Sequence, residues 1–179
     1  SIRIARAASG KDKVAVCGYH GWHDWYLSVN HNNVGDDLSN HLLKGLDPSG
    51  VPKSLQNTVF PFTYNNFEEL SQIVRDNDIG LIKMEVKRNF EPEDGFLKKV
   101  RDLATKKNIV LIFDECTSGF RETFGGIFKK YQVEPDMAMF GKTLGNGYAV
   151  TSVIGKKDVM EQAQSTFISS TFWTERIGS

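Results

Sequence analysis

A lysine set among glycines is the residue of this chain best suited to chemistry. Lys142 lies in the segment 140–148, which reads Phe-Gly-Lys-Thr-Leu-Gly-Asn-Gly-Tyr. Desolvation and neighbouring cations lower the pKa of a lysine, and the neutral amine that results condenses with an aldehyde. The small neighbours would admit a bulky planar ligand, so we expect a Schiff base at this lysine. A surface lysine in a glycine-rich turn is the alternative that the segment alone leaves open.

The same segment also invites comparison with nucleotide-binding loops. A P-loop ends in Gly-Lys-Ser/Thr and has a glycine five positions earlier, where this chain has Asp136. The nicotinamide fingerprint needs a third glycine where Val150 stands. Both motifs fail on spacing. A P-loop-like binder, which ATP with magnesium would stabilise, remains as a weak alternative.

A carboxylate pair follows the most apolar run of the chain. Residues 109–113 read Ile-Val-Leu-Ile-Phe, and Asp114 comes next. Such a run predicts a strand buried on both faces of a parallel sheet, and open α/β sheets bind ligands at the carboxyl ends of their strands. With pyridoxal phosphate, a carboxylate there keeps the pyridine nitrogen protonated. The alternative roles of Asp114 are to cap the next segment or to pair with Arg121.

A turn dense in aromatic residues follows a short strand-like run near the N-terminus. Tyr19 is the best placed of them to stack on a flat cofactor ring, although packing in the core is the alternative. His20 and His23 raise the possibility of zinc. We predict no metal site, because neither cysteine has a second ligand at zinc-finger spacing and no His-Glu-x-x-His occurs.

Together these stretches resemble the class III pyridoxal-phosphate aminotransferases, in particular the branch that includes glutamate-1-semialdehyde aminomutase. The resemblance rests on segments 18–21, 114–121, 135–136, 140–148 and 170–173. It implies the large domain of a fold-type I transferase, with pyridoxal 5'-phosphate as cofactor. It also implies transfer of an amino group between an amino donor and a carbonyl acceptor. An aminomutase and a non-catalytic remnant of the same fold are the alternatives.

The resemblance assigns four residues to the cofactor ring. Lys142 would form the Schiff base and, once displaced, move a proton between substrate and cofactor. Asp114 would pair with the pyridine nitrogen. Tyr19 would cover one face of the ring, and His20 would lie near its edge.

Three further positions carry the resemblance less closely. Cys116 falls where relatives have valine or isoleucine against the opposite ring face, and a reduced cysteine behaves as a small hydrophobe. Thr117 falls where relatives have Gln or Met near the ring hydroxyl. Thr171 matches a threonine that reaches the phosphate of the neighbouring subunit's cofactor. The resemblance therefore implies a homodimer with a shared active site.

Some positions depart from the family pattern. The usual Glu-Pro is replaced in segment 81–89, so we assign no catalytic role to Glu85 or Asn89. Gly-Asn-Gly at 145–147 replaces the Gly-Gly-Gly of aminomutases and favours transamination. An arginine for a substrate carboxylate could be Arg88, Arg121 or a residue outside this chain.

Length places the chain within a larger enzyme. Relatives are more than twice as long, so residues 1–179 correspond to the central part of the cofactor-binding large domain. The upstream phosphate-binding turn and the C-terminal small domain are expected to be absent. We therefore expect weak cofactor binding, or none, and no activity from the isolated chain.

Composition excludes several other classes. Twenty-two basic and twenty-two acidic residues cancel, so no broad positive field would hold nucleic acid or an anionic membrane. No apolar run approaches the roughly 20 residues of a membrane helix. Two cysteines beside apolar sequence suit a reducing compartment, and we expect a cytoplasmic protein.

The order of elements predicts an α/β fold. Strand-like runs are expected at 13–17, 79–86, 109–113, 136–140 and 150–155. They alternate with helices expected at 95–107 and around 67–74, where apolar residues recur at helical spacing. This alternation predicts a mainly parallel sheet between helices. Segment 30–53 reads as a long irregular excursion near the substrate entrance.

Overall fold

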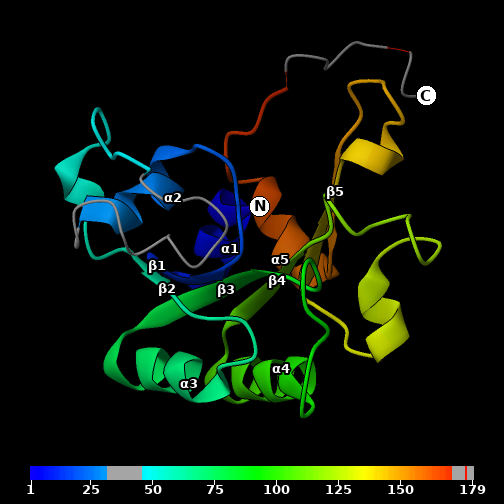
Figure 1. Ribbon diagram of the computed structural model, residues 1–179. Helices are drawn as coiled ribbons and strands as arrows, with labels where there is room; N and C mark the ends of the chain where they lie inside the picture. Colours follow the sequence, from blue (N-terminus) through cyan, green and yellow to red (C-terminus); the bar gives the residue numbers. More distant parts are fainter. Residues whose placement is uncertain (32–45, 171–175, 177–179) are drawn as a thin grey trace.

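A mainly parallel sheet forms the centre of the molecule, as the alternation of elements predicted (Figure 1). The computed structural model describes residues 1–31, 46–170 and 176. The six strands lie in the order β2-β1-β3-β4-β5-β6. Their bounds are Lys13–Cys17 (β1), Val59–Pro61 (β2), Ile79–Glu85 (β3), Val110–Asp114 (β4), Met137–Phe140 (β5) and Ser152–Gly155 (β6).

Strand register aligns the carboxyl ends of the central strands. Strands β1 to β5 pair in parallel, whereas β6 runs antiparallel to β5 at the edge of the sheet. Glu85 at the end of β3 lies opposite Asp114 at the end of β4, and Asp114 lies opposite Met139 of β5. The residues that follow these strands therefore share one edge of the sheet.

Helices cover both faces of the sheet (Figure 1). Helix α3 (Phe67–Asp76) and helix α4 (Phe96–Lys107) lie on one face, and helix α1 (Ile2–Ser9) and the short helix α5 (Lys157–Met160) lie on the other. Apolar side chains from each pair of helices join a separate buried cluster with the strands. The two expected helices are confirmed at α3 and α4.

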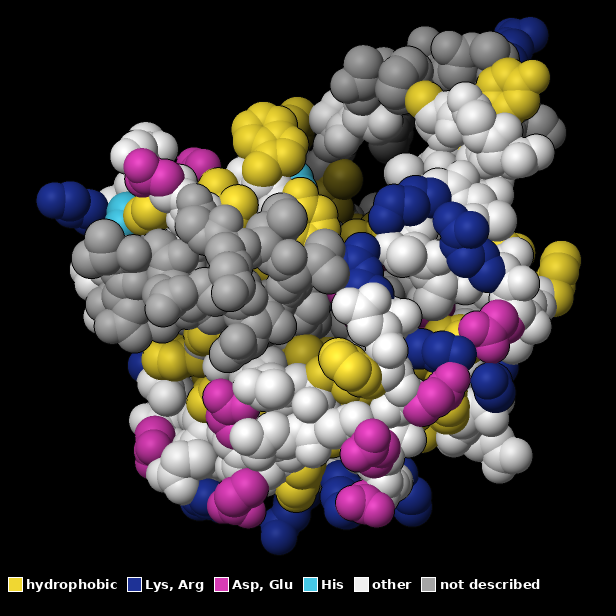
Figure 2. All heavy atoms as spheres, in the orientation of Figure 1, with side chains coloured by type: hydrophobic (Ala, Val, Ile, Leu, Met, Phe, Trp, Pro, Cys, Tyr) yellow, Lys and Arg dark blue, Asp and Glu magenta, His cyan; other side chains and the backbone are white. Residues whose placement is uncertain are grey.

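Local signals explain where these helices begin and end. The side chain of Asn66 accepts a hydrogen bond from the Glu69 N–H at 3.2 Å and caps the start of α3. Asn108, with φ of 53°, ends α4 in the left-handed conformation that asparagine tolerates. Figure 2 shows acidic and basic side chains interspersed over the outer surface of α3 and α4, as expected from the balanced charge.

Strand β2 was not anticipated from the sequence. It is a three-residue edge strand that ends in Pro61, and proline is tolerated at sheet edges because it lacks the donor of a ladder hydrogen bond. The described parts of the expected irregular excursion hold short turns, because Ser28–His31 (η1) and Lys53–Leu55 (η3) are 3-10 helices. The rest of that excursion, residues 32–45, lies outside the described residues.

The remaining elements are single turns. They are α2 (Asp24–Leu27), η4 (Ile127–Tyr131), η5 (Lys142–Leu144) and η6 (Glu161–Ala163). Within the described ranges, no helix is long and apolar enough to cross a membrane.

Candidate active site

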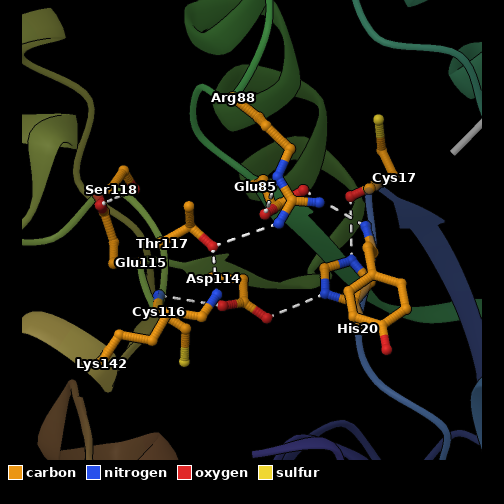
Figure 3. Close-up of polar contacts among 12 residues, drawn as sticks. Cys17, His20, Glu85, Arg88, Asp114, Glu115, Cys116, Thr117, Ser118 and Lys142 are labelled. Carbon is orange, nitrogen blue, oxygen red and sulfur yellow. Dashed lines mark hydrogen bonds and ion pairs between the residues drawn. The ribbon is translucent and has the colours of Figure 1, made fainter. Parts of the chain in front are cut away.

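Polar side chains gather where β1, β3, β4 and β5 end (Figure 3). His20 follows β1, Arg88 follows β3, Asp114 ends β4, and Lys142 follows β5. Because these strands are parallel neighbours, segments more than a hundred residues apart in sequence meet at one edge.

Asp114 is a buried carboxylate with three partners. Its Oδ2 lies 2.9 Å from His20 Nδ1 and 3.2 Å from Lys83 Nζ, and its Oδ1 accepts the Cys116 N–H at 3.2 Å. Burial alone would raise the pKa of Asp114. The hydrogen bond with His20 and the charge of Lys83 outweigh burial and hold that pKa well below its ordinary value. Asp114 is therefore charged at neutral pH.

The two alternatives for Asp114 have different outcomes. Its contact with the Cys116 N–H is a cap on the following turn, so this alternative is realised beside the ion pair. The pairing with Arg121 is not formed among the described residues, because Arg121 instead donates from Nε to the Thr117 carbonyl at 2.6 Å. Asp114 can cap the turn and carry its charge in the ion pair at the same time, because Oδ1 accepts the Cys116 N–H and Oδ2 faces His20 and Lys83.

His20 is enclosed behind Asp114. It is 6% exposed, and its Nε2 lies 3.0 Å from the Cys17 carbonyl oxygen. Tyr26 meets the imidazole edge-on at 5.6 Å. Burial lowers the pKa of His20 to about 4, against the opposing effect of Asp114. The buried His20 ring therefore holds the Asp114 carboxylate in position through its Nδ1 contact. His23, its partner in the rejected zinc site, is exposed, and no cluster of three metal-binding side chains occurs among the described residues.

Lys142 contacts the turn that follows Asp114. It opens the 3-10 turn η5 directly after β5 and Gly141, with a left-handed φ of 43°. A non-glycine residue in this conformation costs roughly 1–3 kcal/mol, so the fold must hold it in place. Its Nζ donates to Thr117 Oγ1 at 2.7 Å. The turn 114–117 thus carries both the buried carboxylate and the partner of the exposed amine (Figure 3).

Cys116 and Tyr19 border the same region. Burial raises the pKa of the Cys116 thiol to about 11, so this side chain is an uncharged thiol at neutral pH. A Cβ atom added to Gly141 would lie 3.4 Å from the Sγ of Cys116, so the thiol packs closely against this glycine. Tyr19 is half-buried and packs edge-to-face on Tyr26 at 6.2 Å.

Glu85 and Arg88 form a linked pair beside this turn. Glu85 is 6% exposed, accepts the Tyr19 N–H at 3.3 Å, and pairs with Arg88 Nε at 3.3 Å. Arg88 NH2 also donates to Thr117 Oγ1 at 3.4 Å. Glu85 therefore positions Arg88 next to the hydroxyl that Lys142 contacts.

Lys83 was not predicted as a site residue from the sequence. The signal was a single charged residue inside the apolar strand β3, and its meaning depends on a partner from another strand. Thr171, the predicted contact with a neighbouring phosphate, lies outside the described residues. The structure brings together the other predicted site residues: Lys142, Asp114, Tyr19, His20, Cys116 and Thr117.

The sequence profile of class-III aminotransferases matches residues 2–177. The chain belongs to this family.

Curated aminotransferases and aminomutases resemble the whole chain. A 3-aminobutyryl-CoA aminotransferase of Cloacimonas acidaminovorans is 37% identical over 190 residues, covering 99% of this chain and 41% of the relative. A glutamate-1-semialdehyde 2,1-aminomutase of Sulfolobus acidocaldarius is 33% identical, covering 96% of this chain and 42% of the relative. The chain thus spans about two fifths of the curated relatives it matches.

Solved structures of pyridoxal-phosphate and transaminase proteins share the fold. An omega-transaminase from Sphaerobacter thermophilus superposes with a TM-score of 0.74 at 26% identity, covering 89% of this chain and 38% of that chain. The FumI protein of Sphingopyxis sp. MTA144, a PLP internal aldimine form, superposes with a TM-score of 0.79 at 22% identity, covering 96% of this chain and 40% of that chain. The expected fold-type I α/β architecture is confirmed.

Proposed function

We propose that the protein containing this chain is a pyridoxal-phosphate-dependent aminotransferase that moves an amino group between an amino donor and a carbonyl acceptor. One observation carries the proposal. The turn 114–117 begins at the buried, charged carboxylate of Asp114 and holds the exposed amine of Lys142 through Thr117 Oγ1 at 2.7 Å. Family membership supports the same activity.

The residues present suit pyridoxal phosphate. The cofactor supplies an aldehyde and a ring that accepts electrons from a substrate carbanion. Lys142 would hold the aldehyde carbon and, when released, would carry a proton at Nζ. Asp114 would keep the pyridine nitrogen protonated through its negative charge. Tyr19 and the uncharged thiol of Cys116 offer surfaces for the two ring faces.

The wider setting of the chain is part of the same proposal. We infer that residues 1–179 form the central part of the large domain, because the curated relatives are more than twice as long. We also infer a cytoplasmic homodimer in which Thr171 reaches the cofactor of the partner subunit. The two cysteines are both free thiols, which suits a reducing compartment.

The covalent link to Lys142 can be tested directly in the full-length protein. We expect purified wild-type protein to be yellow through its bound cofactor, and Lys142→Ala to lose this covalent absorbance. Borohydride followed by peptide mapping should label position 142 in the wild type. Lys129→Ala is the control and should keep the absorbance. Lys129 lies on η4, and its amine donates to the Phe124 carbonyl. A borohydride-reducible adduct that persists in Lys142→Ala would overturn the assignment.

Aminomutase activity is the second candidate. Several curated aminomutases match about nine tenths of the chain, at 31–36% identity. A screen of amino acids against the cofactor-loaded full-length protein separates the two activities. A transaminase should convert the cofactor stoichiometrically to its amino form with a single donor and release a carbonyl product. An aminomutase should instead isomerise one substrate without net release of a carbonyl product.

A further inference from the structure

Lys83 is a charged side chain in the centre of a buried strand. All seven residues of β3 are buried, and Lys83 is 4% exposed. It lies between Val16 of β1 and Ile112 of β4, both of which are fully buried. Removing an ammonium from water costs several kcal/mol unless a partner compensates for the charge. An apolar side chain would pack here without that cost. The burial of the Lys83 ammonium therefore points to a partner that compensates for its charge.

The compensating partner of Lys83 is Asp114. The ammonium lies 3.2 Å from Asp114 Oδ2, and it also lies over the ring of Trp25 at 5.4 Å from the centroid. Among the described residues, Lys83 and His20 are the cationic side chains within ion-pair distance of Asp114, and both contact the same oxygen. Two potential cations therefore compete to neutralise one carboxylate.

The contacts of His20 show that this competition decides whether the imidazole is charged or neutral. Nδ1 faces the Asp114 carboxylate and Nε2 faces the Cys17 carbonyl, so both ring nitrogens lie against acceptors. A charged imidazolium donates to both acceptors, whereas a neutral imidazole donates to only one. Burial and the positive charge of Lys83 oppose the imidazolium and keep the pKa of His20 low. The hydrogen-bond geometry alone would favour the charged ring.

Other ionisable groups surround the pair without replacing Lys83. They are the Ser1 amino group at the start of α1, the buried Cys17 thiol at the end of β1, Tyr26 of α2 against the His20 ring, Glu85 at the end of β3, Cys116 after β4 and Lys142 after β5. Glu85 is engaged by Arg88, Lys142 lies on Thr117, and Cys116 is an uncharged thiol. The fixed charge that faces Asp114 from inside the sheet is the ammonium of Lys83.

We propose that Lys83 is a positioning residue, whose ammonium neutralises Asp114 so that His20 stays uncharged and the carboxylate keeps a constant electrostatic setting across the neutral pH range. The importance of this setting for catalysis rests on the proposed function, in which Asp114 holds the cofactor ring. The electrostatic claim itself does not depend on the cofactor. Without Lys83, the buried carboxylate would draw a proton onto His20, and the charge of the site would vary with pH.

The first test follows the titration of His20 in full-length, cofactor-free protein. Imidazole proton signals are recorded by NMR from pH 4 to pH 8, and the His20 signal is identified by its absence in His20→Gln. In wild type we expect no titration of His20 above pH 5. In Lys83→Met, which removes the charge but keeps a long side chain, we expect the His20 midpoint to rise by at least one pH unit.

Two variants separate charge from packing. Lys83→Arg keeps the charge and should leave the midpoint near its wild-type position. Lys13→Met removes a lysine from β1 whose amine contacts Asn77, and should also leave it unchanged. An unchanged midpoint in Lys83→Met, or an equal rise in Lys83→Arg, would overturn the proposal. If Lys83→Met does not fold, Lys83→Gln replaces it, and a wild-type His20 midpoint at or above 6.5 overturns the proposal by itself.

The second test links Lys83 to the cofactor. We expect the dissociation constant of pyridoxal phosphate to vary less than twofold between pH 6 and pH 8 in wild type, after correction for ionisation of the free cofactor. In Lys83→Met, the change in this dissociation constant between pH 6 and pH 8 should be at least fivefold larger than the change in wild type. Failure of wild type to bind the cofactor would contradict the proposed function, whereas the NMR titration would still decide the role of Lys83.

Discussion

The hydroxyl of Thr117 lies between two cations. It accepts hydrogen bonds from Lys142 at 2.7 Å and from Arg88 at 3.4 Å. A short side chain here lets Arg88 approach Lys142. This places a fixed positive charge next to the amine that is proposed to react.

Arg88 is the better placed of the two arginines considered for a substrate carboxylate. It lines a hollow of about 150 Å³ together with Thr117 and Arg121, and its NH1 is buried without a hydrogen-bond partner among the described groups. Glu85 holds the opposite side of the guanidinium. Arg121 also lines the hollow, but it is exposed and its Nε is engaged by the Thr117 carbonyl. We expect a substrate carboxylate to pair mainly with Arg88.

Steady-state kinetics of Arg88→Gln in the full-length protein check this expectation. A hydrogen bond to a charged group contributes about 1.5–3 kcal/mol, so KM for carboxylate-bearing amino donors should rise roughly tenfold or more. Amines without a carboxylate should be affected less than threefold. Arg121→Gln is the matched control and should change KM less than Arg88→Gln. Equal losses for both classes of donor would remove Arg88 from this role.

At the scale of elements, Asp136 joins three segments at the start of β5. Its Oδ2 accepts the Leu111 N–H of β4 at 2.8 Å and pairs with Arg101 of α4 at 2.9 Å, while its Oδ1 pairs with Lys156 at 2.7 Å. In the sequence this aspartate excluded a P-loop, and it belonged to segment 135–136, which carries part of the family resemblance. In the structure it ties the amino ends of β4 and β5 to α4, at the opposite end of β5 from Lys142.

Asp136→Asn should therefore destabilise the protein without changing its chemistry directly. Loss of the charge leaves the Arg101 guanidinium, which is 17% exposed, without its carboxylate. Breaking a largely buried pair in this way costs about 2–4 kcal/mol. Urea unfolding of the full-length protein should show this loss. Lys156→Ala removes the more exposed partner and should cost only about 0–1 kcal/mol, as surface pairs do. Similar losses in both variants would contradict the proposed anchoring role.

At the scale of the whole molecule, stability should depend on pH through the buried pair His20 and Asp114. Folding lowers the pKa of both groups, from 6.5 to about 4 for His20. The unfolded chain therefore binds more protons than the folded protein as the pH falls, and the free energy of unfolding decreases. The contribution of His20 is complete above its unfolded pKa of 6.5 and is lost as the pH falls through about 4.

Urea unfolding between pH 7 and pH 4 measures this dependence. Because one pKa unit corresponds to about 1.4 kcal/mol, the titration of His20 should remove about 2–3 kcal/mol over this range. His20→Asn removes the imidazole and should flatten the dependence by this amount. His23→Asn, which changes an exposed histidine three positions away, should not. Identical slopes in wild type and His20→Asn would show that His20 is not buried uncharged.

The isolated chain should bind pyridoxal phosphate weakly or not at all. It spans about two fifths of its curated relatives, and from the family resemblance alone we infer that the phosphate-binding turn lies outside residues 1–179. Fluorescence titration of the isolated chain against the full-length protein checks this, and we expect at least a hundredfold weaker binding. Affinity equal to that of the full-length protein would mean that residues 1–179 hold the phosphate themselves.

Sequence patterns alone predicted five of the strands and two of the helices, and they supplied the residues from which the candidate site was proposed. The apolar run before Asp114 predicted strand β4, and the helical spacing of apolar residues predicted α4, because both signals are local. The ends of parallel strands in turn placed Asp114 and Lys142 on one edge. Strand β2 escaped prediction because three residues ending in a proline carry too short a pattern.

Only the tertiary structure decided how charges pair around Asp114. Lys83, His20 and Asp114 come from different strands or the turns after them, and their contacts depend on the register of β3 against β4. Register is a property of the assembled sheet, because a shift of one residue would turn Lys83 to the opposite face while leaving every local pattern intact. The residue types of the site can thus be read along the chain, whereas the charge of His20 depends on the groups that the fold places around it, namely the Asp114 carboxylate, the Cys17 carbonyl and the Lys83 ammonium beyond Asp114.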